Sequence, residues 1–141
     1  MGMRRTAIGK VLLISPDKRL RGQLRACLIH EGIAGNNLFA VETSHACQTL
    51  VSQIRPRVLV IDDAITDTDG STLLRTLRQQ LPDSLVVYLA THHTPELERE
   101  IRQLGVLYYT EKPPDEGSLR KVLSTVLHQP LQRGLALCVS I

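Results

Sequence analysis

Two side chains of opposite charge follow apolar runs in this 141-residue chain. Asp62 comes directly after the run 58–61, and Lys112 comes three residues after the run 106–109. If both runs are parallel strands, the carboxylate and the ammonium reach the same edge of one sheet. An ion pair within about 4 Å at that edge favours the charged form of both groups and needs no metal.

The runs that would position these residues have the length of strands. They are 11–14, 38–41, 58–61, 85–89 and 106–109. The runs are almost continuously apolar, which is typical of strands that are covered on both faces, as in parallel sheets.

The segments between the runs carry apolar residues at helical spacing. These stripes are Leu20, Leu24, Cys27 and Leu28; Ala46, Cys47, Leu50, Val51 and Ile54; Leu73, Leu74, Leu77 and Leu81; Leu97, Ile101 and Leu104; and Leu119, Val122, Leu123, Val126 and Leu127. Gly32, Pro56, Pro82 and Gly105 follow the first four stripes as helix-ending residues, and Thr94-Pro95 is typical of a helix start. We therefore predict a three-layer α/β fold of the flavodoxin type, with five parallel strands in the order 2-1-3-4-5.

Length and composition indicate one domain, which we expect to cover residues 9–128. Residues 129–141 are then a tail or the start of a linker. This tail ends in the apolar run 135–141, so it either docks on the body or a partner, or the chain was cut from a longer protein. No apolar stretch reaches the ~18 residues of a membrane helix, and the start lacks the apolar core of a signal peptide, so we expect a cytoplasmic protein.

Cysteines, basic residues and loop histidines give no sign of a separate site. Cys27, Cys47 and Cys138 lack metal-like spacing, which favours reduced thiols. The net charge is +3, but the arginines are dispersed and aromatic residues make up only 3%, which argues against nucleic-acid binding by this segment. His92 and His93 follow the fourth run without nearby partner ligands, so we expect solvated loop residues.

The spacing of Asp62, Asp69-Gly70 and Lys112-Pro113 within five strand–helix units resembles the receiver domain of bacterial response regulators. The resemblance covers roughly residues 9–128. It implies that the Asp62 carboxylate accepts a phosphoryl group from a phosphohistidine, with Mg²⁺ bound beside it, and that a sensor histidine kinase or phosphotransfer protein is a partner. It also implies a turn into the third helix at Asp69-Gly70 and a cis peptide bond before Pro113.

The resemblance implies supporting roles for further residues. Lys112 would pair with the phosphoryl oxygens, and Ala64 would give the metal a backbone carbonyl. The hydroxyl residue of the family aligns with Ala90, although Thr91 follows and a shift of one residue would supply the hydroxyl. Tyr109 matches the aromatic whose rotation reports the state of the site, but we favour a packed core residue.

Ser15-Pro16 stand where the family has two acidic metal ligands after the first strand. Mg²⁺ in proteins is held by carboxylates together with phosphate, so this loss should weaken metal binding severely. The charges of Asp62 and Lys112 alone would cancel, whereas a usual receiver pocket is net negative and recruits a divalent cation. We therefore predict a pocket closed without Mg²⁺, unless another acid replaces the missing pair.

Three acids could in principle replace that pair. Asp63 and Glu111 each adjoin a site residue, so alternation along the strand should turn them to the opposite side. Asp17 is the best substitute, but Ser15-Pro16-Asp17 resembles the cap, first and second positions of a helix, where an acid suits the helix dipole. We favour the capping role.

These observations predict a degenerate receiver that binds a protein partner or a second copy through its fourth helix, fifth strand and fifth helix. The alternatives are a working phosphoacceptor at Asp62, and an Asp62 whose role is purely structural. We expect no enzyme on this architecture. A flavodoxin needs a phosphate-binding loop after the first strand, and a haloacid-dehalogenase-type hydrolase needs an Asp at position 64, where this chain has Ala64.

Overall fold

The computed structural model of the chain describes residues 9–112 and 114–127, apart from the side chain of Val126. Five parallel strands form one sheet in the order β2-β1-β3-β4-β5, as predicted. The strands are β1 (Val11–Ile14), β2 (Leu38–Val41), β3 (Val58–Asp62), β4 (Leu85–Ala90) and β5 (Tyr108–Glu111). The helices are α1 (Lys18–His30), the short 3-10 helix η1 (Gly35–Asn37), α2 (Ser44–Ile54), α3 (Gly70–Gln80), α4 (Pro95–Gln103) and α5 (Glu116–Leu127).

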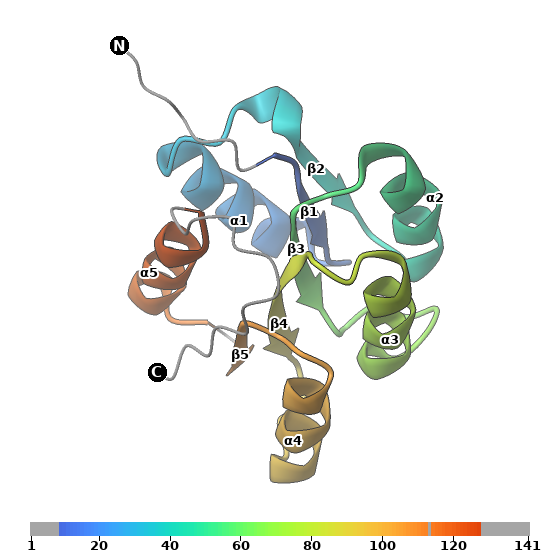
Figure 1. The fold of residues 1–141 in the computed structure, drawn as a ribbon. Coiled ribbons are helices and arrows are strands. Elements are labelled where there is room, and N and C mark those ends of the chain that lie inside the picture. The colour runs from blue at the N-terminus through green and yellow to red at the C-terminus, as the bar shows by residue number, and fades with distance from the viewer. Residues whose placement is uncertain (1–8, 113, 128–141) are drawn as a thin grey trace.

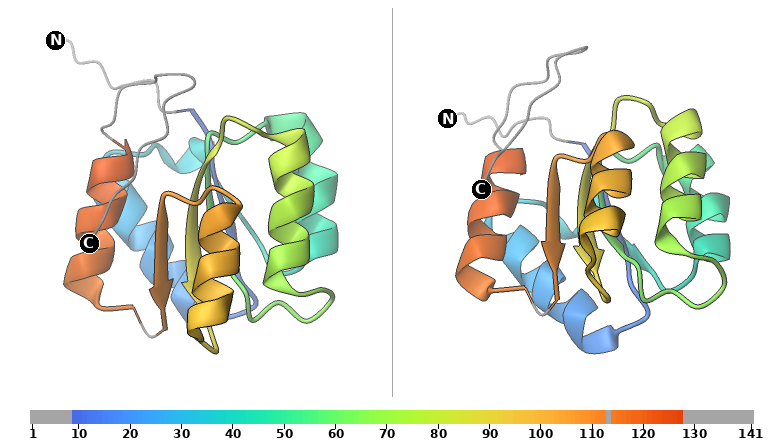
Figure 2. Two further views of the ribbon diagram at one scale, coloured as in Figure 1. Left: turned by 60° about the horizontal axis from the view of Figure 1, so that its bottom comes forward. Right: turned by 90° about the horizontal axis from the view of Figure 1, so that it is seen from below.

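The α-helices cover both faces of the sheet, which gives the flavodoxin-like, three-layer arrangement. Helices α1 and α5 pack on one face, and α2, α3 and α4 pack on the other (Figures 1 and 2). Each face has its own apolar core cluster. Every residue of β1 and β3 is buried, because successive side chains of these central strands enter the two cores in turn.

The third and fourth strands each end one residue later than predicted, and two further elements differ from their predicted bounds by two residues. The fifth strand was expected at 106–109, but regular pairing begins at Tyr108 opposite Val87 and continues to Glu111. The apolar run starts before the strand because Val106 and Leu107 already pack against the core clusters. The first helix begins two residues later than expected, since Asp17 is its N-cap.

Several predicted features lie outside the described residues, namely the tail 129–141, Pro113 and Cys138. Cys27 and Cys47 are buried free thiols, which agrees with the predicted reduced state. Burial raises the pKa of Cys47 to about 12. None of the helices in the described part of the chain has the length and apolar character of a membrane span.

Candidate functional site

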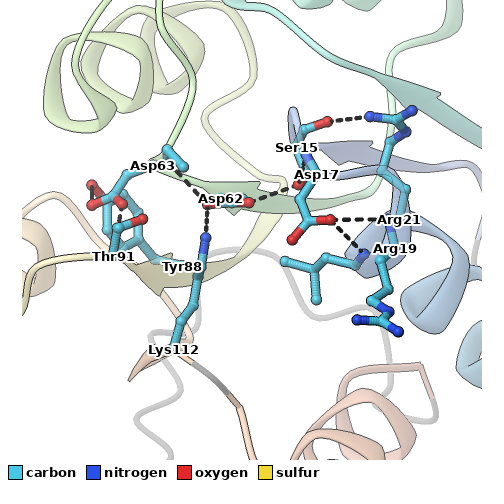
Figure 3. Close-up of polar contacts among 11 residues, drawn as sticks. Ser15, Asp17, Arg19, Arg21, Asp62, Asp63, Tyr88, Thr91 and Lys112 are labelled. Atoms are coloured by element: carbon cyan, nitrogen blue, oxygen red, sulfur yellow. Dashed lines mark hydrogen bonds and ion pairs between the residues drawn. The ribbon is translucent and has the colours of Figure 1, made fainter.

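Asp62 and Lys112 meet at the carboxyl edge of the sheet, as the sequence predicts. Asp62 is the last residue of β3 and is completely buried. Lys112 follows β5, and its Nζ lies 2.8 Å from Asp62 Oδ1 (Figure 3). The backbone N–H of Lys112 donates to Ala90 O over 2.9 Å, which holds the chain after β5 against the end of β4. The ammonium therefore crosses β4 to reach the carboxylate.

Ser15, the residue after β1, holds the other oxygen of Asp62. Its hydroxyl donates to Asp62 Oδ2 over 2.6 Å, and both side chains are buried. The Ser15 backbone N–H donates to Val41 O at 3.0 Å, and its carbonyl accepts from Arg21 Nη1 at 2.8 Å. The prediction that Ser15 caps the first helix is wrong, because its hydroxyl points to the sheet edge.

Asp17 caps helix α1. Its Oδ1 accepts from the backbone N–H groups of Arg19 and Leu20 at 2.9 and 3.3 Å. Its own N–H donates to Ser15 Oγ at 3.1 Å. The predicted capping role is confirmed, although Asp17 stands at the N-cap and not at the second helical position. Its carboxylate is directed to the helix start and away from Asp62 (Figure 3).

The backbone of Ala64 completes the surroundings of Asp62. Its N–H donates to Asp62 Oδ1 over 2.9 Å. Together with Lys112 and Ser15, it makes three donors around one buried carboxylate. These hydrogen bonds replace the water that the carboxylate loses on burial.

Asp63 points to the other side, as alternation along the strand predicts. Its Oδ2 accepts from the hydroxyl of Tyr88 at 2.9 Å, and its Oδ1 accepts from the N–H of Thr91 at 2.8 Å (Figure 3). Burial, and next the negative charge of Asp63, raise the pKa of Tyr88. This contact was not predicted, and its one signal in the sequence is a tyrosine inside an otherwise aliphatic strand.

Gly70 leaves the space that this contact occupies. A Cβ at position 70 would overlap Tyr88 Oη and would lie 2.6 Å from Asp63 Cβ. Asp69, the N-cap of α3, accepts from the N–H of Thr72 at 2.8 Å. The predicted turn at Asp69-Gly70 is confirmed, and its glycine is required by the close approach of Tyr88.

Tyr109 is packed in the core, the role that the sequence analysis favours. It is 6% exposed, and its hydroxyl lies 2.9 Å from His93 Nδ1. Burial, followed by the charge of Glu98, raises the pKa of Tyr109 to about 12. His92 is exposed as expected, whereas the predicted solvated position holds only in part for His93, because its ring packs beside Tyr109.

A family model for the response regulator receiver domain matches residues 11–124 of this chain. The chain belongs to this family. Within the receiver domain, Asp62 stands in the phosphorylation position, at the end of β3. The sheet order and the helices on both faces agree with this assignment.

Individual relatives are distant. The DNA-binding transcriptional regulator NtrC of Proteus hauseri is 26% identical over 126 residues, which are 89% of this chain and 26% of that regulator. The signal receiver domain of a DNA-binding response regulator from Colwellia psychrerythraea 34H has a TM-score of 0.77 at 18% identity, over 86% of this chain and 99% of that one. The beryllofluoride-activated NtrC4 receiver domain dimer has a TM-score of 0.76 at 19% identity, over 85% of this chain and 97% of that one. These two structures share the fold of this receiver.

The receiver's two candidates for a phosphoryl-binding hydroxyl differ in position. Ala90 ends β4 and is completely buried, and it contributes its carbonyl to Lys112. Thr91 Oγ1 is buried and has no hydrogen-bond partner among the described residues. Thr91 therefore has the free hydroxyl that Ala90 cannot supply.

The residues present do not fit the Mg²⁺ ion that the receiver family implies. Ser15 is a neutral donor that already bonds Asp62, and the carboxylate of Asp17 caps α1. Asp63 faces Tyr88, and Ala64 could add only a neutral backbone carbonyl. Within 9–112 and 114–127, no cluster of three or more His, Cys, Asp or Glu side chains could hold a metal ion. A hard cation that prefers several carboxylate oxygens lacks its ligands here.

Proposed function

We propose that this receiver domain is degenerate and acts as a protein-interaction module without phosphoryl transfer. One observation carries the proposal: Ser15 and Lys112 hold the two oxygens of Asp62 at 2.6 and 2.8 Å. Oδ1 accepts a second hydrogen bond from Ala64, so both of its acceptor positions are used. The carboxylate is engaged as a structural acceptor instead of being open to a phosphoryl group.

The charges around Asp62 support the same proposal. Phosphoryl transfer depends on cations that neutralise the transferred oxygens. Lys112 is already paired with Asp62, and the described residues offer no acidic set for a divalent ion. An incoming phosphoryl group would have to break the Asp62–Lys112 pair and bring its own negative charge into the pocket.

The proposed interaction surface consists of α4, β5 and α5, and its partner is a second copy of the chain or another protein. We include a sensor histidine kinase or a phosphotransfer protein among the proteins proposed to bind this domain. The NtrC4 receiver is described as a dimer, which supports association for this fold. We propose that the protein acts in the cytoplasm and is not an enzyme.

Sedimentation velocity over a concentration series tests this surface. Exposed Arg99 lies on α4, and R99E reverses one charge there. We expect R99E to weaken self-association, whereas R25E on the exposed face of α1 leaves it unchanged. Equal effects of the two variants would remove α4 from the interface.

A second candidate function is phosphoryl acceptance at Asp62. The position of Asp62 in the family and the unpartnered Thr91 hydroxyl favour it. Incubation with acetyl phosphate and Mg²⁺, followed by intact mass spectrometry, separates the two candidates. The degenerate module gains no mass. A gain of one phosphoryl group in the wild type that is absent in D62N establishes the acceptor instead.

A further inference from the structure

The polar groups of Ser15 all have hydrogen-bond partners. Its N–H donates to Val41 O at 3.0 Å, and its carbonyl accepts from Arg21 Nη1 at 2.8 Å. Its hydroxyl oxygen accepts from the N–H of Asp17 at 3.1 Å, and the hydroxyl donates to Asp62 Oδ2 at 2.6 Å. Because the N–H of Asp17 uses a lone pair of this oxygen, the hydroxyl hydrogen is left for Asp62. The orientation of Ser15 therefore decides whether Asp62 keeps this hydrogen bond.

Arg21 reaches Ser15 from the first turn of α1. Its backbone N–H donates to Asp17 O at 3.0 Å, so it lies one turn after the N-cap. Side chains on a helix lean toward the helix N-terminus, which directs the guanidinium back to the loop before α1. Arg21 and Asp62 approach Ser15 from opposite sides (Figure 3).

Glu42 holds the Arg21 guanidinium from the end of β2. Its Oε2 lies 3.4 Å from Arg21 Nη2. Ser15 and Glu42 follow Ile14 and Val41, which are paired in the register of β1 and β2. The guanidinium therefore bonds the residue after β1 with one nitrogen and the residue after β2 with the other. A planar guanidinium holds two acceptors in a fixed geometry.

We propose that Arg21 is a positioning residue, which holds Ser15 so that the Ser15 hydroxyl stays on Asp62. Ser15 is completely buried, and loss of Arg21 would leave its carbonyl without a donor among the described residues. An unpaired buried carbonyl favours rotation of the Ser15–Pro16 peptide toward water, and this rotation moves the hydroxyl of the same residue. Arg21 thus acts on Asp62 through Ser15 and not by its charge. The inference rests on the proposed function, in which hydrogen bonds keep the oxygens of Asp62 engaged.

Carbon-13 nuclear magnetic resonance of aspartate-labelled protein tests this inference, because the carboxyl carbon of Asp62 senses the hydrogen bonds to its oxygens. The Asp62 signal is assigned by its absence in D62N. S15A removes the hydroxyl and defines the displacement that loss of this bond causes. R21M should displace the signal in the same direction as S15A. R19M is the control, since it removes an exposed arginine of the same helix turn and should leave the signal unchanged.

The double variant S15A/R21M separates positioning from charge. If Arg21 acts through the Ser15 hydroxyl, R21M adds no displacement in the S15A background. If its charge acts on Asp62 directly, R21M displaces the signal equally in both backgrounds. E42A removes the exposed partner of Arg21 and should displace the signal in the same direction by a smaller amount. Far-UV circular dichroism is recorded for each variant, and E42A decides if R21M is not folded.

The proposal is overturned if S15A or R21M leaves the Asp62 signal unchanged, or if R21M displaces it equally in both backgrounds. Acetyl phosphate with Mg²⁺, followed by intact mass spectrometry of the wild type, tests the proposed function separately. A phosphorylated wild type, together with an R21M displacement that requires Ser15, would sink the degenerate function and leave the role of Arg21 standing. An unphosphorylated wild type with an unchanged signal in R21M would do the reverse.

Discussion

Two charged side chains at opposite ends of the sheet have different types of hydrogen-bond partner. Asp62 lies at the carboxyl end, and its main partners are the side chains of Ser15 and Lys112. Arg78 on α3 reaches the start of β4, and among the described residues its guanidinium donates only to backbone carbonyls. These acceptors are Leu81, Pro82, Ser84, Leu104 and Gly105.

This difference separates a site that could bind a ligand from a purely structural contact, which we call a brace. Arg78 joins the ends of α3 and α4 to the start of β4, and its burial lowers the pKa of the guanidinium. No carboxylate bonds the Arg78 guanidinium in the described structure. This contact therefore has no charged side-chain partner that a ligand could displace. Asp62 has partners that a ligand could displace, and it lies at the edge where parallel α/β sheets bind their ligands. Three variants test whether the two ends differ as described, and a fourth tests an exposed carboxylate elsewhere.

The largest effect is expected for K112M. It leaves the buried Asp62 carboxylate without its counter-charge, which should lower the free energy of unfolding by about 3 kcal/mol. Urea denaturation measures the change. The exposed Lys121 on α5 supplies the control K121M, which should be nearly neutral. The double variant D62N/K112M should be more stable than K112M, and the opposite order would mean that Asp62 is not the group left unpaired.

R78M should be the next most destabilising change. It removes a charged donor from several carbonyls, including Ser84 O at 2.7 Å, and should cost about 2 kcal/mol. R75M is the control from the same helix, because exposed Arg75 makes one ion pair with Glu100. In thermal unfolding, the melting temperature of R78M should be well below that of R75M. Equal melting temperatures would show that Arg78 is not a brace.

S15A is expected to have a smaller effect, of about 1 kcal/mol, since it removes one hydrogen bond to a carboxylate that keeps two other donors. Exposed Ser52 on α2 gives the control S52A, where alanine should be neutral or slightly stabilising. Urea denaturation compares the two. A stabilising S15A would argue that the Ser15 hydroxyl does not support the buried carboxylate.

The smallest effect depends on pH and concerns an exposed carboxylate. Backbone N–H groups of Ser44 and His45 donate to Asp67 and lower its pKa from the usual 3.8. A lowered pKa in the folded state stabilises above pH 3.8, and this contribution is lost as the pH falls through the folded value. Urea denaturation from pH 7 to pH 3 should show the advantage of wild type over D67N shrinking below pH 3.8. A constant difference would mean that Asp67 does not titrate with folding.

The meeting of Asp62 and Lys112 could be predicted because each follows an apolar run, and the order of parallel strands brings such ends together. The contact of Ser15 with Asp62 could not. It depends on the register in which Ile14 is opposite Ile61, and an apolar run does not specify register to one residue. The same limit hid the stacking of the Tyr88 ring on the Tyr109 ring, which is set by the pairing of β4 with β5.

By itself, the sequence determined the layer architecture, the strand order and the sheet edge that carries the site, because hydrophobic periodicity and chain connectivity are local properties. Only the tertiary structure decided which groups satisfy each buried charge. Ser15 was expected to cap a helix but bonds Asp62, and His93 was expected in solvent but bonds Tyr109. Arg78 bonds backbone carbonyls, which every residue has, so the sequence does not indicate them. A buried polar group must be paired, and the partner is whichever donor or acceptor the packed chain brings within reach.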